Sequence, residues 1–478
     1  MCSVEEDGDL QPLASEKRNK VKTCVKCGEP GVLITRIHDS FCKACFQVYV
    51  VHKFRAAIGK SKLIRDGEHV LVAFSGGANS AALLHLIQDG LSVRAHKKLR
   101  FIPTLLHVDE CCVLDLPQSE NQRLREKVSQ LMTESGFPSY LTSLELGLNI
   151  DRNKKDNSSQ DKTCPFWSTE RDVTLTPPDV DVTDDLKVRL SSVLQGLSST
   201  SSREDFIRNL RNQLIVCIAR QMGFTKILTA ECSTRLGVRI LTDVSQGRGS
   251  QVALNTGFSD ARNGDVMFVR PVRDLNAKEL TLYNNMFGVD SVFIPCITTK
   301  GQPGASIERL AETFVTGLQA DFASTVSNIV RTSEKLGLPD LNSTKCVLCQ
   351  SPLDTDVGSA SALRAVEFSL KLSRAGGTGS SSVSSPSTNG DKSCTSTQSA
   401  PGCCGQGDGS CQTRPPTRLE TEEIMDHLCF GCRLSLRNFN GSTESLPVFV
   451  TTETEAARQR AKLREEIADF LLEDAEDS

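Results

Sequence analysis

Hydrophobic residues in this chain occur in short runs, separated by longer segments with helical periodicity. Residues 70–74 are apolar without alternation, which is typical of a strand buried on both faces of a parallel sheet. Further apolar runs begin at Phe101, lie near 139–144 and occupy 226–230, with helical patterns at 120–134 and from about Glu204. This alternation predicts an α/β fold with a doubly wound, mainly parallel sheet, whose ligands bind at the carboxyl ends of the strands.

Several predicted helices carry basic residues outside their apolar stripe. One helix covers 46–65, a long one begins near Glu204, another ends near Arg248, and more are expected from about Asn276 and over 304–338. Two interpretations of these cations stay open: a solvated helix surface, or contacts with RNA phosphate. The candidate RNA-binding residues are Lys53, Arg55, Arg208, Arg211, Arg235 and Arg239.

Shifts in composition divide the chain into segments. Polar, Ser- and Gly-rich stretches bury too little apolar surface to fold alone and mark a tail and two insertions. The expected segments are a disordered N-terminus (1–20), a cysteine module with a basic helix (21–66), an α/β domain (67–340) with an insertion (151–203), a second cysteine module (341–450) with a disordered insertion (372–418), and an acidic helix or tail (451–478).

A tight Ser-Gly-Gly-Ala-Asn-Ser turn at 75–80 joins the first predicted strand to a helix. Gly76 and Gly77 let the backbone direct several N–H groups toward one point, and the free N–H groups of the helix face the same point. Ser75, Gly76, Gly77 and Ser80 are therefore the candidate phosphate-binding loop. The spacing excludes a Walker A loop and a dinucleotide fingerprint, and the alternative is an ordinary tight turn.

Eight of the nineteen cysteines form four Cys-x-x-Cys pairs, a spacing that favours metal binding over disulfides in a chain of this size. One structural zinc is expected at Cys24, Cys27, Cys42 and Cys45, and a second at Cys346, Cys349, Cys429 and Cys432. The long insertion inside the second set is compatible with one site, because the entropy of loop closure grows only logarithmically with length.

The net charge of −4 does not by itself indicate a nucleic-acid-binding protein, so any RNA contact must come from local patches. No apolar run reaches the roughly 18 to 20 residues of a membrane span, and the acidic N-terminus is unlike a leader peptide. These features predict a soluble, cytoplasmic protein without a membrane partner.

Taken in order, the cysteine pairs, the Ser-Gly-Gly turn, the Arg-Pro followed by a Lys-Glu helix (270–279), and Gly-Arg-Gly (247–249) resemble the tRNA 2-thiolation branch of the PP-loop ATP pyrophosphatase family. The resemblance covers nearly the whole chain except the two insertions. It implies ATP-dependent adenylation of O2 of the wobble uridine in tRNAs for Lys, Glu and Gln, followed by sulfur attack at C2 and departure of AMP. It also implies sulfur delivery by a thiocarboxylated ubiquitin-related modifier. Within the branch, the chain is most similar to the non-catalytic partner of a catalytic thiolase, with which it forms a heterodimer.

Active members of this family carry acids and thiols that the chain lacks. Asn79 stands where their phosphate turn has Asp, and Ala-Glu-Cys-Ser-Thr-Arg at 230–235 replaces their Gly-His-x-x-Asp-Asp segment. The region 201–206 lacks their Cys-x-x-Cys, although Cys296 corresponds to a further cysteine. Because Mg²⁺ on ATP prefers anionic oxygen ligands, these losses predict that metal-assisted adenylation fails, and we interpret the chain as a pseudoenzyme with structural zinc. Whether it still binds ATP and Mg²⁺ stays open. Two alternatives stay open: a working adenylating sulfurtransferase, and a zinc-ribbon adaptor that binds only proteins.

Overall fold

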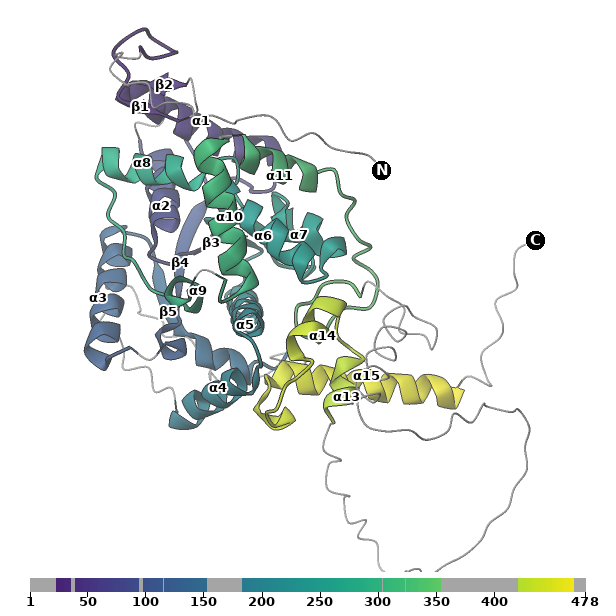
Figure 1. Ribbon diagram of the computed structural model, residues 1–478. Helices are drawn as coiled ribbons and strands as arrows, with labels where there is room; N and C mark the ends of the chain where they lie inside the picture. Colours follow the sequence, from purple (N-terminus) through teal and green to yellow (C-terminus); the bar gives the residue numbers. More distant parts are fainter. Residues whose placement is uncertain are drawn as a thin grey trace, which may run out of the picture.

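The computed structural model describes residues 23–35, 39–93, 98–114, 116–152, 183–302, 304–322, 324–353 and 420–467. The expected disordered N-terminus (1–20), the insertion at 372–418 and the last part of the tail (468–478) lie outside these residues, so those expectations stay predictions. The described chain forms an α/β body with the N-terminal cysteine module at one end and the C-terminal module at the other (Figure 1).

A six-stranded sheet forms the centre of the body. In spatial order its strands are β5 (Ser139–Ser143), β4 (Ile102–Asp109), β3 (His69–Ala73), β6 (Lys226–Leu228), β8 (Met267–Val269) and β7 (Ser259–Asp260). All neighbouring strands are parallel except β7 and β8. This arrangement confirms the predicted doubly wound, mainly parallel sheet.

The strand order reverses between β3 and β6. The chain builds β3, β4 and β5 outward and then returns to the other side of β3 with β6. In doubly wound sheets the ligand crevice lies at such a switch point, beyond the carboxyl ends of the strands. The turn at 75–80 follows β3 and the segment 229–232 follows β6, so both lie at this crevice.

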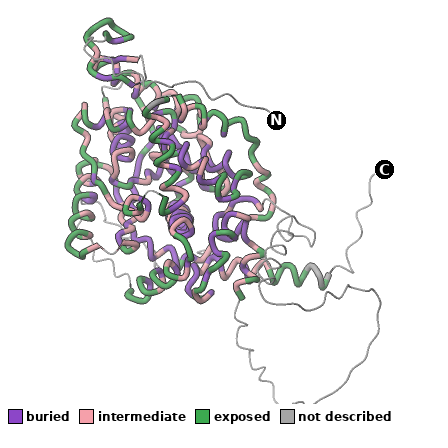
Figure 2. The backbone as a smooth tube through the Cα atoms, viewed as in Figure 1, coloured by how far each residue is buried: buried purple, intermediate pink, exposed green. Residues whose placement is uncertain are grey.

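Helices cover both faces of the sheet. They are α2 (Ala78–Leu91), α3 (Gln118–Glu134), α4 (Asp184–Gly196), α5 (Thr200–Gln221), α6 (Ser233–Ser245), α7 (Val252–Thr256), α8 (Ala277–Phe287), α9 (Ile297–Lys300), α10 (Ile307–Asp321) and α11 (Thr325–Ser333). Val70 and Val72 belong to a core with α2 and α8, whereas Leu71 belongs to a core with α4 and α5. Buried residues accordingly run through the centre of the body, and α10 and α11 add an outer layer on α6 (Figure 2).

The expected insertion at 151–203 is partly a packed element. Residues 153–182 lie outside the described part, but α4 occupies 184–196 and α5 already begins at Thr200 with Ser199 as its N-cap. Leu186, Leu190 and Val193 of α4 are buried in the main core. Three apolar residues at helical spacing are therefore enough to dock a helix whose sequence is otherwise polar.

The N-terminal module consists of a short hairpin and a helix. Strands β1 (Leu33–Ile34) and β2 (Ser40–Phe41) pair antiparallel, and α1 (Lys43–Ser61) follows with Cys42 as its N-cap. Phe46, Phe54 and neighbouring residues of α1 are fully buried in the core that includes α2 and α8. The helix is thus part of the body, while the hairpin extends from it (Figure 1).

The C-terminal module contributes to the main core. It contains α13 (Thr421–Met425), α14 (Phe430–Leu436) and α15 (Val448–Ile467). Phe449 and Val450 are buried in the same core as the second cysteine set, and Glu453 pairs with Arg152 at 2.8 Å. The acidic terminal helix therefore begins before residue 451, and its first turns pack inside the fold.

Candidate functional site

The Ser75–Ser80 turn has the backbone shape expected of a phosphate loop. Gly76 has a φ of +77°, which favours glycine, and Gly77 is the N-cap of α2. The Ser75 hydroxyl donates to Ser80 Oγ at 3.1 Å, and the Ser80 hydroxyl donates to the Gly77 carbonyl at 2.9 Å. The structure brings the four predicted loop residues together, and two of their hydroxyl groups bond within the turn.

Apolar residues cover one side of this turn. The Val292 N–H donates to the Gly76 carbonyl at 2.8 Å, which holds the segment after α8 against the loop. A Cβ at Gly76 would lie 3.0 Å from Val128 Cγ2 and 3.5 Å from Ile294 Cδ1. Hydrocarbon next to the loop disfavours an unscreened polyanion there, because a phosphate loses hydration that these groups do not replace.

A side-chain hydrogen bond spans the crevice. Asn79 at the start of α2 donates from Nδ2 to Cys232 Sγ, the N-cap of α6, at 3.3 Å. Burial raises the pKa of the Cys232 thiol, which has no exposed surface. Asn79 and Cys232 lie in the two segments where the resemblance predicts departures from active family members, and these two residues bond to each other across the switch point.

The acids at the carboxyl edge of the sheet are paired with arginines. Glu110 after β4 binds Arg211 of α5 through two hydrogen bonds, and Glu231 after β6 binds Arg270. Although burial acts in the opposite direction, the Arg270 and Arg239 guanidinium groups hold the pKa of Glu231 below its ordinary value. Asp109 is likewise paired, with Arg125. A divalent cation would have to compete with a guanidinium for each of these carboxylates.

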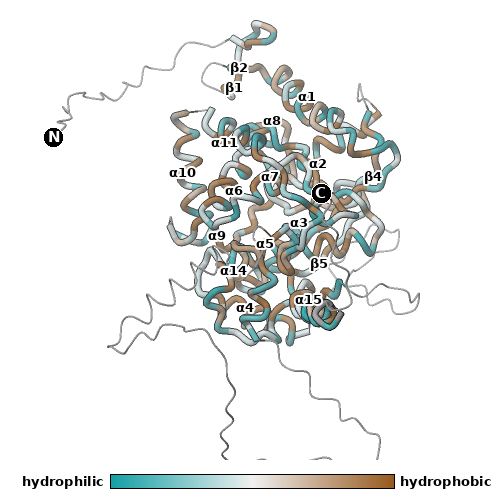
Figure 3. Tube along the Cα trace, turned by 90° about the vertical axis from the view of Figure 1, so that its right-hand side faces the viewer, coloured by the Kyte–Doolittle hydropathy of each residue, from teal (hydrophilic) through white to brown (hydrophobic). Residues whose placement is uncertain are grey.

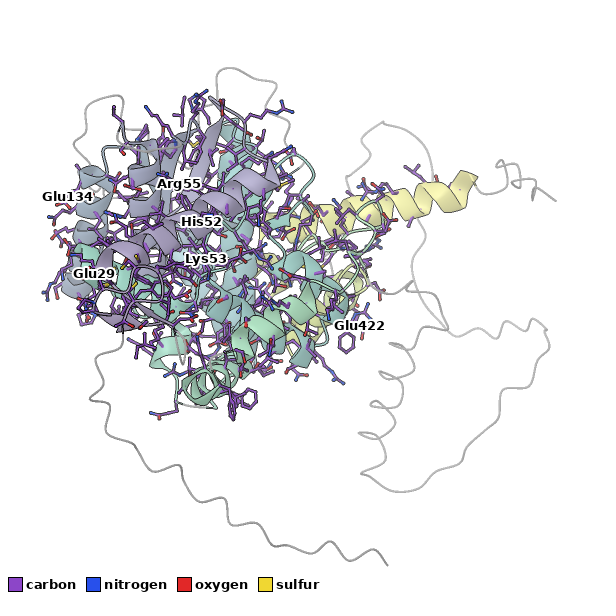
Figure 4. The ribbon with its side chains drawn as sticks, turned by 90° about the horizontal axis from the view of Figure 1, so that it is seen from above. Glu29, His52, Lys53, Arg55, Glu134 and Glu422 are labelled. Atoms are coloured by element: carbon purple, nitrogen blue, oxygen red, sulfur yellow. The ribbon has the colours of Figure 1, made fainter. Side chains whose placement is uncertain are left out.

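The six candidate RNA-binding residues all have acidic partners. Lys53 lies 3.9 Å from Glu279 and over the Tyr49 ring, and Arg55 lies 3.5 Å from Asp89. The other four pairs are Arg208 with Glu308, Arg211 with Glu110, Arg235 with Glu312 and Arg239 with Asp243. Lys53 and Arg55 lie on α1 beside His52 (Figure 4), whereas the other four residues belong to α5 and α6. Arg235 is the most exposed of the six, at 52% of its side chain.

The first cysteine set converges at the tip of the N-terminal module. The sulfur atoms of Cys24, Cys27, Cys42 and Cys45 lie within 4.8 Å of one another, with 3.6 Å between Cys27 and Cys42. Gly28, at a φ of +78°, provides the turn that the first pair requires. Four thiolates at about 2.3 Å from one zinc have sulfur separations of about 3.8 Å, so the set fits a tetrahedral ion.

The second cysteine set is buried inside the main core. Cys346, Cys349, Cys429 and Cys432 also lie within 4.8 Å of one another, and the Cys349 and Cys429 sulfur atoms are 3.7 Å apart. All four are at most 5% exposed, whereas Cys27 of the first set is exposed. This set fits the same tetrahedral geometry, and its four sulfur ligands are buried.

Sequence reasoning missed the residues that join the second set to the α/β body. Arg248 binds both carboxylate oxygens of Asp205 on α5, and its Nη2 lies 3.6 Å from Cys432 Sγ. The Gly-Arg-Gly motif at 247–249 was the available signal, but from sequence it indicated only a family resemblance. Nothing in local sequence indicated that its partners were 43 and 184 residues away.

Within the described residues no helix is long and apolar enough to cross a membrane. Comparison with a model of the cytoplasmic tRNA 2-thiolation protein 2 family gives a match over residues 306–434. A solved structure of the U34-tRNA thiolase NcsA from Methanococcus maripaludis with its [4Fe-4S] cluster is also similar, with a TM-score of 0.48 and 14% identity over 70% of this chain and 97% of that chain.

Full-length relatives give a stronger match. The chain is 36% identical to cytoplasmic tRNA 2-thiolation protein 2 of Xenopus tropicalis and 36% identical to that of Danio rerio, covering all of both chains in each case. It is 32% identical to the Homo sapiens protein, over all of this chain and 99% of the relative. Identity at this level along the whole length shows that the chain belongs to the cytoplasmic tRNA 2-thiolation protein 2 family.

Proposed function

We propose that this chain is a non-catalytic subunit of the cytoplasmic complex that 2-thiolates the wobble uridine of tRNAs for Lys, Glu and Gln. In this proposal it forms a heterodimer with a catalytic PP-loop thiolase. The partner adenylates O2 of the uridine with ATP, and sulfur from a thiocarboxylated ubiquitin-related modifier displaces AMP at C2. Family membership supports the reaction, and the crevice of this chain supports its non-catalytic part.

The Asn79–Cys232 hydrogen bond is the observation that carries the non-catalytic assignment. Adenylation requires a free phosphate loop, carboxylates for Mg²⁺ and room for the nucleotide. In this chain an amide and a buried neutral thiol join the two sides of the crevice, and the nearby Glu231 is held by Arg270. Each requirement for ATP chemistry therefore meets a group that opposes it.

Exchange of labelled pyrophosphate into ATP tests this assignment directly. The purified chain alone is expected to give no Mg²⁺-dependent exchange, while the assembled heterodimer with tRNA exchanges label. The catalytic subunit alone is the control for activity that belongs to the partner. Clear exchange by this chain alone would support the competing assignment, a working adenylating sulfurtransferase.

Loss of the chain from cells tests the reaction itself. Cells without the chain are expected to lack 2-thiouridine in tRNAs for Lys, Glu and Gln. A variant in which Ser75 and Ser80 are replaced by Ala, with Asn79 and Cys232 unchanged, is expected to restore the 2-thiouridine. If the chain were only a protein-binding adaptor, the assembled complex would give no RNA crosslink to it. A crosslink from α6 would favour a direct tRNA contact.

The outer face of α10 supports a protein partner. Among the side chains of this helix that the structure describes, the exposed ones are uncharged: Leu310, Thr313, Phe314, Thr316, Gly317 and Ala320. Leu310 and Phe314 are 59% and 54% exposed, and Phe322 at the end of the helix is 62% exposed. The helix lies at the edge of the molecule (Figure 3). Exposed apolar residues such as Leu310, Phe314 and Phe322 favour burial against another subunit, and we assign this face to the catalytic thiolase.

Both cysteine sets are proposed to hold one structural zinc each. Sites made of four cysteines in closed tetrahedral geometry leave no ligand position for substrate, so a zinc there stabilises the fold and supplies no reaction step. Ser75, Gly76, Gly77 and Ser80 retain the shape of a pyrophosphate loop. We propose that they are a structural remnant and not an ATP site.

A further inference from the structure

A buried arginine, Arg248, links the second cysteine set to the α/β body, in addition to the hydrophobic core that they share. Arg248 is 2% exposed, and it reaches from the end of α6 to Asp205 on α5, which is 1% exposed. The same guanidinium directs Nη2 toward Cys432 Sγ at 3.6 Å. Ser435, three residues beyond Cys432 on α14, donates to the Asp205 carboxylate at 2.9 Å. The Asp205 carboxylate and the Cys432 sulfur therefore both contact the Arg248 guanidinium.

Two glycines make room for this contact. A Cβ on Gly431, which immediately precedes Cys432, would overlap Nε, Cγ and Cδ of Arg248. A Cβ on Gly247, at a φ of +71°, would overlap the Phe430 ring. The Gly-Arg-Gly loop and the Cys-Phe-Gly-Cys turn therefore interlock, and each has glycine where the other approaches. This close fit places the guanidinium beside the sulfur independently of the ion pair with Asp205.

An arginine suits this position better than a lysine would. Its planar fork can bind both oxygens of Asp205 and still direct an N–H toward the sulfur, whereas an ammonium acts as a point charge. Metal-bound cysteine is a thiolate, and four thiolates around one Zn²⁺ leave two negative charges in a fully buried place. A donor cation next to one thiolate lowers the cost of burying that charge.

We propose that Arg248 is an outer-shell partner of the metal at the second cysteine set, which orients Cys432 and stabilises its thiolate. This inference rests on the metal occupancy proposed above. Groups in this position affect metal affinity without touching the ion, and their loss typically weakens binding by about 10- to 100-fold. The first cysteine set has no arginine contact among its described residues and acts as an internal reference.

Release of zinc to a coloured chelator from the full-length chain tests the proposal. The wild-type chain is expected to release two equivalents, one from each set. In Arg248→Lys, which keeps the charge but not the fork, one equivalent is expected to be released faster while the other keeps its wild-type rate. Competition with the chelator at equilibrium is expected to show about 10- to 100-fold weaker binding of that one equivalent. Cys432→Ser in a second sample identifies which equivalent belongs to the buried set.

The matched control is Arg262→Lys. Arg262 also lies near the second set, with 11% of its side chain exposed, and is paired with an acid, Asp260. Its guanidinium hydrogen-bonds Ser351 and Asn255 and, among the described residues, donates no hydrogen bond to a cysteine sulfur, although its charge acts on Cys349. If zinc release were equally accelerated in Arg262→Lys, the effect of Arg248 would be one of general packing, and the proposal would be overturned. Unchanged release in Arg248→Lys would overturn it as well.

The absorption spectrum of the Co²⁺-substituted chain gives a readout that a change in packing alone does not alter. A hydrogen bond to a thiolate lowers the energy of its lone pairs, so its loss shifts the thiolate-to-Co²⁺ charge-transfer band to longer wavelength. That shift is expected in Arg248→Lys and not in Arg262→Lys. If Arg248→Lys fails to fold, Gly431→Ala replaces it, because the added methyl displaces the guanidinium without changing the arginine or a ligand. A wild-type band in that variant would contradict the proposal. A wild-type chain that holds no metal would instead contradict the occupancy on which it rests.

Discussion

Phe449 offers a quantitative test of how the C-terminal helix is attached. This side chain is fully buried in the main core, and the Arg152 guanidinium lies 4.2 Å from its ring centre. Phe449→Ala removes a buried aromatic group and leaves a cavity, which together cost about 3 to 5 kcal/mol. Loss of the cation–π contact adds about 0.5 to 1 kcal/mol. Together these terms predict a decrease of about 3.5 to 6 kcal/mol in the free energy of unfolding.

Urea denaturation followed by circular dichroism measures this decrease, provided that the transition is a single step. Leu463→Ala is the matched control, since Leu463 lies on the same helix and is 56% exposed. Surface changes of this kind usually alter stability by less than about 0.5 kcal/mol. If Phe449→Ala costs no more than its control, α15 is a tail that does not belong to the core, and the reasoning from burial is wrong.

Four further predictions concern the crevice, the proposed surfaces and pH. Asn79→Asp is expected to give no pyrophosphate exchange, because restoring one acid leaves the neighbouring carboxylates paired with arginines; exchange by this variant would show that a single amide blocks the chemistry. Phe314→Asp is expected to reduce copurification with the catalytic thiolase by at least about tenfold, because the new carboxylate would be buried in an apolar contact. Val188→Asp, on the exposed side of α4, is the control and is expected to leave copurification unchanged. Arg235→Glu is expected to weaken tRNA binding by the heterodimer and to lower the salt dependence by about one ion, and an unchanged slope in a binding titration would remove Arg235 from the interface. Burial lowers the pKa of His107 below its ordinary 6.5. Below about pH 6.5 the unfolded chain therefore binds more protons than the folded chain, and the free energy of unfolding is expected to fall as pH decreases. The urea midpoints at about pH 7.5 and about pH 5.5 should differ less in His107→Gln than in the wild-type chain.

Local sequence was enough to predict the features that depend on neighbouring residues. The apolar run at 70–74, the glycines of the turn and the Cys-x-x-Cys spacing each act within a few residues, and β3, the turn and the two cysteine sets follow them. Cys42, for example, is both a member of the first set and the N-cap of α1. Such features are readable because backbone geometry and ligand spacing leave few alternatives.

The contacts on which the proposed function rests join residues far apart in the chain. Asn79 and Cys232 are 153 residues apart, and Arg208 is 100 residues from Glu308. From sequence, Arg208 is a cation on the polar side of a helix; in the fold that side faces α10, and the residue is buried. Patterns of polarity predict which side of a helix avoids the apolar core, but not whether another helix with opposite charges covers that side.

Under the proposed non-catalytic function, the structure also gives a physical reason why such a chain can lose catalytic acids and keep its cysteine clusters. The second cysteine set lies in one hydrophobic core with Leu71 of β3 and Leu106 of β4, so loss of a ligand would disturb the packing that holds the sheet. Asn79 and Cys232 instead occupy positions at the crevice, where an amide and a thiol satisfy each other without help from a ligand. On this proposal, substitution at the crevice leaves the fold intact, whereas substitution at the buried cysteines disturbs the main core. A subunit that, as proposed, still has to present α10 and its basic helices to a catalytic partner and to tRNA therefore remains constrained at the metal site long after the constraint on the phosphate site has gone.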